Sequence, residues 1–232
     1  MSLLILVRHG QASFLSDDYD RLSERGEAQA RHVGAWLRRT GVVPTSVFAG
    51  PRLRQRETAR LALLELGAST AVAPLDELDE HHAGALLSEH LPAVAAASPD
   101  LARHAAAFAS AGAERARYAE LMLRDAMALW REGHPATGGV ESFSAFRARA
   151  RRALERLTAS DARGQTVLAF TSGGTIGAIV GAVLEVADQH ALELGFASEN
   201  ASCTEIAFSG ARRSLRRLGV SPELPAALRT MR

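Results

Sequence analysis

Residues 3–10 read LLILVRHG, five aliphatic residues followed by Arg8, His9 and Gly10. An uninterrupted apolar run of this length predicts a strand that is covered on both faces. Two strongly polar side chains at the end of such a strand cost solvation free energy unless something there uses them. Gly10 lets the backbone turn tightly after them. The stretch therefore predicts a buried strand with a functional site at its carboxyl end.

Further strands and helices alternate along the chain. Leu22–Gly26 opens a helix that runs to about Arg39, with Ser23 expected as its N-cap. The other predicted elements are strands at 45–49, near 72–75 and at 165–171, helices at 51–66, 143–157 and from 173 onward, and a closing hairpin of 202–208 with 213–218. This alternation predicts an α/β fold, a three-layer sandwich with a largely parallel sheet.

The middle of the chain follows a different pattern. From about Leu87 to Glu132 there is no strand signal, only an alanine-rich helical pattern broken at Pro92, Pro99 and Gly112. We interpret it as a helical cap inserted into one α/β domain that spans residues 1–232.

Composition excludes several classes of function. The formal net charge is only +1, which gives no general attraction for nucleic acid or an anionic membrane. All 27 basic residues are arginine, so Schiff-base chemistry on lysine is excluded. Cys203 is the one cysteine, so no internal disulfide or cysteine-based metal cluster can form. No signal peptide and no apolar run of roughly 20 residues is recognisable, so we expect a cytoplasmic protein.

The ends of the predicted strands carry polar groups. In open α/β sheets, ligands bind outside the carboxyl ends of the strands. GPRLRQRETA at 50–59 places three arginines at a helix start, where Arg54 can reach an anion. LDEHHAGAL at 78–86 adds carboxylates and imidazoles, and Ser172 and Gly173 begin another helix. An imidazole nucleophile beside fixed guanidinium groups suits a phosphate ligand.

Two other kinds of site fit less well. Gly173-Gly174-Thr175-Ile176-Gly177 follows a strand, but its spacing does not match the G-x-G-x-x-G pattern of dinucleotide-binding domains. A G-x-S-x-G hydrolase elbow around Ser172 fails because Phe170 occupies the first glycine position.

Six stretches in order carry a family resemblance: LVRHGQA, LSERGEAQA, GPRLRQRETA, LDEHHAGAL, GVESFSAFRARARRAL and NASCTEIAF. Together they resemble the histidine phosphatase superfamily, which includes the phosphoglycerate mutases, over nearly the whole chain apart from the helical insert. The resemblance implies a phosphohistidine enzyme without a metal or another cofactor. His9 would be the nucleophile, Arg8 and Arg54 the phosphate clamps, and Glu80, four residues before a glycine, the proton donor. Such a donor must hold its proton at the working pH.

One departure from the family pattern affects the site. The family carries a second histidine in a serine-histidine-glycine-glycine segment, where this chain reads Thr171-Ser172-Gly173-Gly174. Losing one preorganised oxyanion donor costs about 10²–10³ in rate. His81 or His82 could compensate. Ala12 and Leu15 stand where many members have a threonine and an asparagine.

The remaining members of the predicted phosphate site are neutral hydrogen-bonding groups and one histidine. Gln11 and Ser13 can form hydrogen bonds to phosphate, as can Ser172 and the backbone of Gly173, and His82 lies where mutase-like members also carry a histidine.

We therefore expect a metal-independent phosphomonoester hydrolase whose small-molecule substrate phosphorylates His9, with activity lowered by Ser172. The substrate and the oligomeric state stay open. A non-catalytic phospho-ligand-binding module is the alternative, supported by Ser172 and opposed by the retention of His9 and Glu80. A phosphoglycerate mutase is less favoured, because it must also hold a carboxylated ester and the chain lacks lysine.

Overall fold

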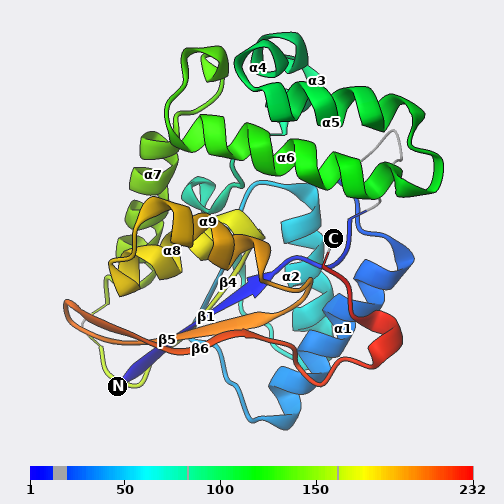
Figure 1. Ribbon diagram of the computed structural model, residues 1–232. Coiled ribbons are helices and arrows are strands. Elements are labelled where there is room, and N and C mark those ends of the chain that lie inside the picture. The colour runs from blue at the N-terminus through cyan, green and yellow to red at the C-terminus, as the bar shows by residue number, and fades with distance from the viewer. Residues whose placement is uncertain (13–19, 83, 161, 232) are drawn as a thin grey trace. The chain divides into compact units, whose positions relative to one another are not determined.

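The computed structural model describes residues 1–12, 20–82, 84–160 and 162–231, which fall into two units (Figure 1). The first unit comprises Met1–Glu80 and Arg149–Arg232, and the second comprises His81–Ala148. The second unit begins before and ends after the insertion predicted at 87–132, and each unit is described below by itself.

The first unit is built on a sheet whose described strands run in the order β3-β2-β4-β1-β5-β6. They are β1 (Ser2–Arg8), β2 (Ser46–Ala49), β3 (Val72–Pro74), β4 (Thr166–Thr171), β5 (Cys203–Ser209) and β6 (Arg212–Val220). The first four are parallel to one another, while β5 and β6 form an antiparallel edge. Leu4 to Val7 are at most 1% exposed, so the apolar run is an interior strand as predicted.

Helices cover both faces of this sheet, which confirms the predicted three-layer α/β fold (Figure 1). The pair α1 (Glu24–Arg39) and α2 (Leu53–Leu66) covers one face, over a core that includes Val7, Leu37 and Phe170. The pair α8 (Gly173–Leu184) and α9 (Asp188–Phe196) lies on the other. Ser23 caps α1 as expected, because its Oγ accepts the Gly26 N–H at 3.1 Å.

The second unit is helical. It contains α3 (Ala85–Ser88), α4 (Leu91–Ala97), α5 (Pro99–Ser110) and α6 (Arg115–Arg131), and α7 (Phe143–Leu157) runs from it into the first unit. Pro92 and Pro99 lie in the first turns of α4 and α5, where a missing N–H costs nothing. Short 3₁₀ turns complete the two units at Asp76–Leu78, Gly112–Glu114, Pro135–Thr137 and Ala226–Leu228. Among the residues described, no helix has both the length and the apolar character needed to cross a membrane.

Candidate active site

The turn after β1 is held by backbone contacts that only glycine permits. A Cβ at Gly10 would lie 2.3 Å from the carbonyl oxygen of Gly26, so the β1 end and the start of α1 touch backbone to backbone. The Gly10 N–H donates to Thr58 Oγ1 on α2 at 3.0 Å, and the His9 N–H donates to Thr171 O on β4 at 2.9 Å. The turn that carries His9 is thereby fixed from both sides.

His9 lies in this turn as a buried, neutral imidazole. Its Nδ1 is 2.7 Å from the Gly10 carbonyl oxygen, and a carbonyl can only accept, so Nδ1 carries the ring proton. The lone pair of Nε2 then faces outward and accepts from Arg54 Nε at 3.1 Å. Burial, followed by the positive charges of Arg54 and Arg8, holds the pKa of His9 well below its ordinary value. The ring therefore keeps a nucleophilic nitrogen over the neutral pH range.

Arg54 reaches His9 from the first turn of α2. It is 4% exposed, and besides its contact with His9 it donates from Nη1 to Asp20 Oδ1 at 2.8 Å. The other carboxylate oxygen of Asp20 accepts the Leu53 N–H at 2.7 Å. Asp20 thus places a negative charge at the positive end of α2 and fixes the orientation of the Arg54 guanidinium.

Arg8 approaches the same place from β1. It donates from Nη1 to the Ser198 carbonyl oxygen. A Cβ on Gly173 would lie 3.4 Å from Arg8 Nε and 2.9 Å from Gly195 O, so the first turn of α8 lies directly against the guanidinium group. Arg8 and Gly173 are therefore neighbours at the carboxyl ends of β1 and β4.

Glu80 is attached to the start of α8. Its Oε2 accepts the Gly174 N–H at 3.1 Å. The preceding residue, Asp79, anchors it: Asp79 Oδ1 accepts the Glu80 N–H at 2.8 Å and pairs with Arg52 at 2.6 Å. Thr175 Oγ1 donates to the Asp79 carbonyl oxygen at 2.7 Å. These contacts hold the Glu80 carboxyl group beside the helix end that Gly173 begins.

Ser172 is the N-cap residue of α8 and is completely buried. Its Oγ accepts from Gln55 Nε2 of α2 at 2.8 Å. Since Thr171 pairs with Arg8 in the parallel register of β1 and β4, Ser172 and His9 leave adjacent strands at the same level. Ser172 is therefore part of this cluster and is not on the surface.

The predicted site residues fall into four groups, of which the last lies in the second unit. His9, Arg8, Arg54, Glu80, Ser172 and Gly173 gather where β1 and β4 end and α2 and α8 begin. Gln11 lies next to them, but its Oε1 accepts from Ser23 Oγ at 3.1 Å, toward α1. Ser13 and Leu15 lie outside the described residues.

His81 and His82 belong to the second unit. There the His81 ring packs on Trp130 and Phe146, with ring centroids 5.2 and 5.6 Å apart.

Sequence reasoning missed four polar residues that hold this site, namely Asp20, Gln55, Thr58 and Asn200. Arg54, Gln55 and Thr58 share the buried face of α2, a face that the arginine-rich sequence around them conceals. The signal that could have found them is spacing, since residues i and i+4 lie on one side of a helix. Asn200 donates from Nδ2 to the His9 carbonyl oxygen at 3.3 Å, across 191 residues of sequence, which no local pattern reports.

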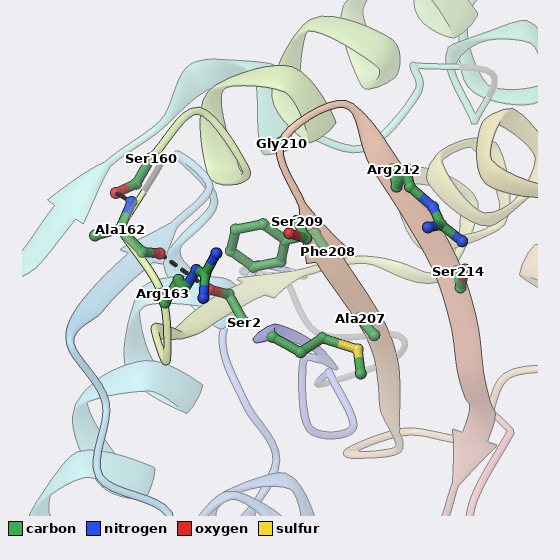
Figure 2. A pocket seen from close by; sticks show the side chains of 11 residues that line it. Ser2, Ser160, Ala162, Arg163, Ala207, Phe208, Ser209, Gly210, Arg212 and Ser214 are labelled. Carbon is green, nitrogen blue, oxygen red and sulfur yellow. Dashed lines mark hydrogen bonds between the residues drawn. The ribbon is translucent and has the colours of Figure 1, made fainter.

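A pocket elsewhere in the first unit lies at the opposite end of the sheet (Figure 2). Ser2 at the start of β1, Phe208 near the end of β5 and Arg163 just before β4 line it, and none of the predicted site residues does. Because ligands of open α/β sheets bind at the carboxyl ends of the strands, the His9 cluster is the better candidate for an active site.

Solved structures share this fold at low sequence identity. A phosphoglycerate mutase from Bacillus anthracis str. Sterne matches with a TM-score of 0.67 and 20% identity, covering 94% of this chain and 92% of that one. A putative alpha-ribazole-5'-P phosphatase from Escherichia coli str. K-12 matches with a TM-score of 0.63 and 20% identity, covering 95% and 97%. A mycobacterial glucosyl-3-phosphoglycerate phosphatase matches with a TM-score of 0.63 and 22% identity, covering 94% and 99%.

Curated sequences match over shorter stretches. A 2,3-bisphosphoglycerate-dependent phosphoglycerate mutase from Erythrobacter litoralis is 36% identical over 94 residues, which is 37% of this chain and 41% of that protein. The mitochondrial serine/threonine-protein phosphatase Pgam5 of Drosophila virilis is 37% identical over 65 residues, which is 27% of this chain and 22% of that protein. The chain thus matches less than half of the length of these two relatives.

The family model of the histidine phosphatase superfamily, branch 1, matches residues 4–117 and 111–221. These matches include β1 with His9, α2 with Arg54 and β4 with the start of α8. The chain belongs to the histidine phosphatase superfamily.

Proposed function

We propose that this protein hydrolyses phosphate monoesters through a phosphohistidine on His9. The observation that carries the proposal is the state of that ring: Nδ1 is committed to the Gly10 carbonyl oxygen, Nε2 keeps its lone pair, and the Arg54 guanidinium lies 3.1 Å from it. A binding module would need the guanidinium groups but would have no use for a deprotonated imidazole. This difference favours an enzyme over the non-catalytic alternative.

The first step forms the phosphoenzyme. Arg8 and Arg54 would clamp the phosphate, with Arg54 Nε transferring its hydrogen bond from His9 Nε2 to a phosphoryl oxygen. His9 Nε2 attacks phosphorus while the bond to the alcohol oxygen breaks. Glu80 gives its proton to that leaving oxygen, and since Oε2 accepts from Gly174 N–H, the proton would be held on Oε1.

The second step returns the enzyme to its starting state. A water molecule attacks the phosphorus of phospho-His9, and the bond from Nε2 to phosphorus breaks. The Glu80 carboxylate takes the proton of the attacking water. Inorganic phosphate leaves with its charge still facing the two arginines, and Glu80 is protonated for the next cycle. Most of the catalytic effect would come from charge stabilisation by Arg8 and Arg54.

The substrate class is a small-molecule phosphate monoester. Two of the structural relatives, a putative alpha-ribazole-5'-P phosphatase and a glucosyl-3-phosphoglycerate phosphatase, are named for compounds of this class. A mutase would need further cationic groups for a carboxylated substrate, and no observation on the described residues favours that reading.

A generic aryl phosphate tests the proposal. The purified protein should hydrolyse it in the presence of a chelator, and His9→Ala should abolish turnover. His190→Ala is the matched control, because His190 is exposed on α9 and should be removable without effect. Turnover that persists in His9→Ala, with the fold intact, would refute the assignment of the nucleophile.

A further inference from the structure

Both ends of the Gln55 side-chain amide make buried hydrogen bonds beside the site. Gln55 is fully buried on α2, directly after Arg54. Its Oε1 accepts the Arg52 N–H at 3.2 Å, and its Nε2 donates to the Leu78 carbonyl oxygen at 3.3 Å and to Ser172 Oγ at 2.8 Å. The amide therefore ties the start of α2 to the start of α8.

The surroundings of this amide fix which end is oxygen and which is nitrogen. The Arg52 N–H can only donate, so it requires the amide oxygen. The Leu78 carbonyl can only accept, so it requires the amide nitrogen. A flipped amide would place two donors together at Arg52 and two acceptors together at Leu78. Ser172 Oγ consequently receives a hydrogen bond from Gln55 and does not give one to it.

This arrangement leaves the hydroxyl proton of Ser172 to be donated elsewhere. Ser172 is completely buried, and within the described residues the contact with Gln55 is the one hydrogen bond that its Oγ makes. A hydroxyl has one proton to give, and a buried donor without an acceptor costs free energy. The Ser172 hydroxyl is thus a buried, oriented hydrogen-bond donor that an acceptor oxygen of a ligand would satisfy.

The neighbours of Ser172 indicate where that oxygen would come from. His9 N–H donates to the carbonyl oxygen of Thr171, the residue before Ser172, at 2.9 Å. Adjacent strands lie about 4.7–4.9 Å apart, so a phosphoryl group on His9 would be close to Ser172. On the other side, Gly173 lies against the Arg8 guanidinium.

We propose that Gln55 is a positioning residue that turns Ser172 into a hydrogen-bond donor to the transferred phosphoryl group. By filling an acceptor site of Ser172 Oγ, Gln55 commits the hydroxyl to donating its own proton to a phosphoryl oxygen. The pair would do the work of the histidine that the chain lacks at this position. This inference rests on the proposed phosphatase activity, and it assigns a role to Gln55 that the proposed reaction steps do not use.

The packing around Gln55 predicts how the variant Ser172→His will behave. A Cβ on Gly50 would lie 2.2 Å from Gln55 Oε1, so the amide is tightly enclosed. A histidine ring at position 172 would extend toward Gln55 Nε2, which already lies 2.8 Å from Ser172 Oγ. Ser172→His alone should therefore lower activity, and Gln55→Ala in the same chain should recover part of the loss. A gain in rate from Ser172→His alone would count against the coupling of the two residues.

A double-mutant cycle tests the coupling directly. Ser172→Ala should lower kcat on an aryl phosphate by about 10²-fold with little change in KM. Gln55→Met, of similar size but unable to donate, should lower kcat by a comparable factor. Gln55→Met should then have little further effect on kcat once Ser172 is alanine. If Gln55 only supports the fold, it will lower kcat equally in both backgrounds, and the proposal is wrong.

Two additions keep the test decisive. Should Gln55→Met not fold, Gln55→Ala replaces it, because it also removes the donor to Ser172 Oγ, with a loss in kcat like that of Ser172→Ala. Gln189→Met on α9 is the control and should match wild type.

Binding of inorganic phosphate, followed by calorimetry on the same variants, separates this inference from the proposed function. If wild type proves inactive but Ser172→Ala and Gln55→Met both weaken phosphate binding, the phosphatase proposal fails and the donor role stands. Unchanged kcat and unchanged phosphate affinity in Ser172→Ala would overturn the donor role.

Discussion

At the scale of one residue, the proposed nucleophile His9 is also a structural contact of the turn after β1. Its ring is almost fully buried, its Nδ1 proton satisfies the Gly10 carbonyl oxygen, and two arginines oppose any further protonation. The same surroundings that keep Nε2 unprotonated also couple the stability of the fold to pH.

The pH dependence of stability follows from the lowered pKa of His9. Below about pH 6.5 an unfolded chain takes up a proton on His9 that the folded chain refuses, so acid favours unfolding. Stability from this residue is complete above that pH and falls as the pH drops toward the lowered pKa, by up to about 1.4 kcal/mol per pH unit. Denaturant unfolding of wild type and His9→Gln across this range should show the difference. Parallel curves for the two proteins would contradict it.

Burial shifts the pKa of Cys203 in the direction opposite to that of His9. Cys203 is 1% exposed on β5, and burial, with a smaller effect from the Glu205 charge, raises the pKa of its thiol to about 12. At neutral pH the thiolate that reacts with alkylating reagents is therefore almost absent. Iodoacetamide should label the native protein far more slowly than the urea-unfolded protein, and native activity should survive the treatment. Equal labelling rates for the two states would show that the thiol is accessible.

At the scale of elements, the site is built where strands end and helices begin. The first turn of α2 contains no acidic residue of its own, and Asp20 supplies the missing negative charge from outside the helix. Its carboxylate serves both the Leu53 N–H and Arg54. Asp20 thus acts as a remote cap for the helix that carries Arg54.

Replacing Asp20 measures the strength of this remote cap. Asp20→Ala removes the acceptor for the Leu53 N–H and should destabilise the protein by about 1 kcal/mol. Asp20→Asn keeps a side-chain oxygen there and should cost less. The ion pair with Arg54 adds little to the difference, because the Asp20 side chain is 39% exposed. Equal unfolding free energies for the two variants would rule out the cap.

The elements were largely predictable, while the contacts between them were not. The apolar run before Arg8, the Ser23 cap and the hairpin of β5 and β6 each follow from local pattern, and the structure confirms them. The pairing of Gln55 with Ser172 joins residues 117 positions apart. It depends on which side of α2 faces the sheet, and a helix start rich in arginine gives no apolar stripe from which to predict that side.

At the scale of the whole chain, the last described residues are tied to the first strand. The Thr230 hydroxyl donates to Asn200 Oδ1 at 3.0 Å and accepts from Gln29 Nε2 at 2.9 Å. The Thr230 carbonyl oxygen accepts the Asn200 N–H at 2.8 Å, and Asn200 in turn holds the His9 carbonyl oxygen. The end of the chain therefore supports the turn that presents the predicted nucleophile.

Thr230→Val tests this long-range support. Valine keeps the shape of the side chain but removes both hydroxyl hydrogen bonds, which should lower the free energy of unfolding by about 1–2 kcal/mol. Because Asn200 loses a partner, kcat on an aryl phosphate should fall as well. Thr70→Val is the control, since its hydroxyl lies 3.5 Å from the Pro44 carbonyl oxygen, at the amino ends of β2 and β3 and not at the carboxyl ends that carry the site. Identical stability of Thr230→Val and wild type would contradict the account.

At this scale, sequence patterns predicted the helical insertion but not its limits. They predicted the helical insertion from proline and alanine content, but placed its limits at 87–132, whereas the second unit also takes in His81, Phe143 and Phe146. These rings pack against Trp130, which lies at the C-terminal end of α6, and this contact depends on the tertiary structure. The network from Thr230 to His9 is equally invisible to local patterns.

The most direct test of the central claim is to capture the phosphorylated enzyme. Wild-type protein turning over an aryl phosphate would be quenched in alkali, which preserves phosphohistidine, digested, and analysed by mass spectrometry. The account predicts a phosphoryl group on His9, absent from His9→Ala and lost on acid treatment. Steady turnover with no phosphoryl group on His9, or with one on a different residue, would contradict it.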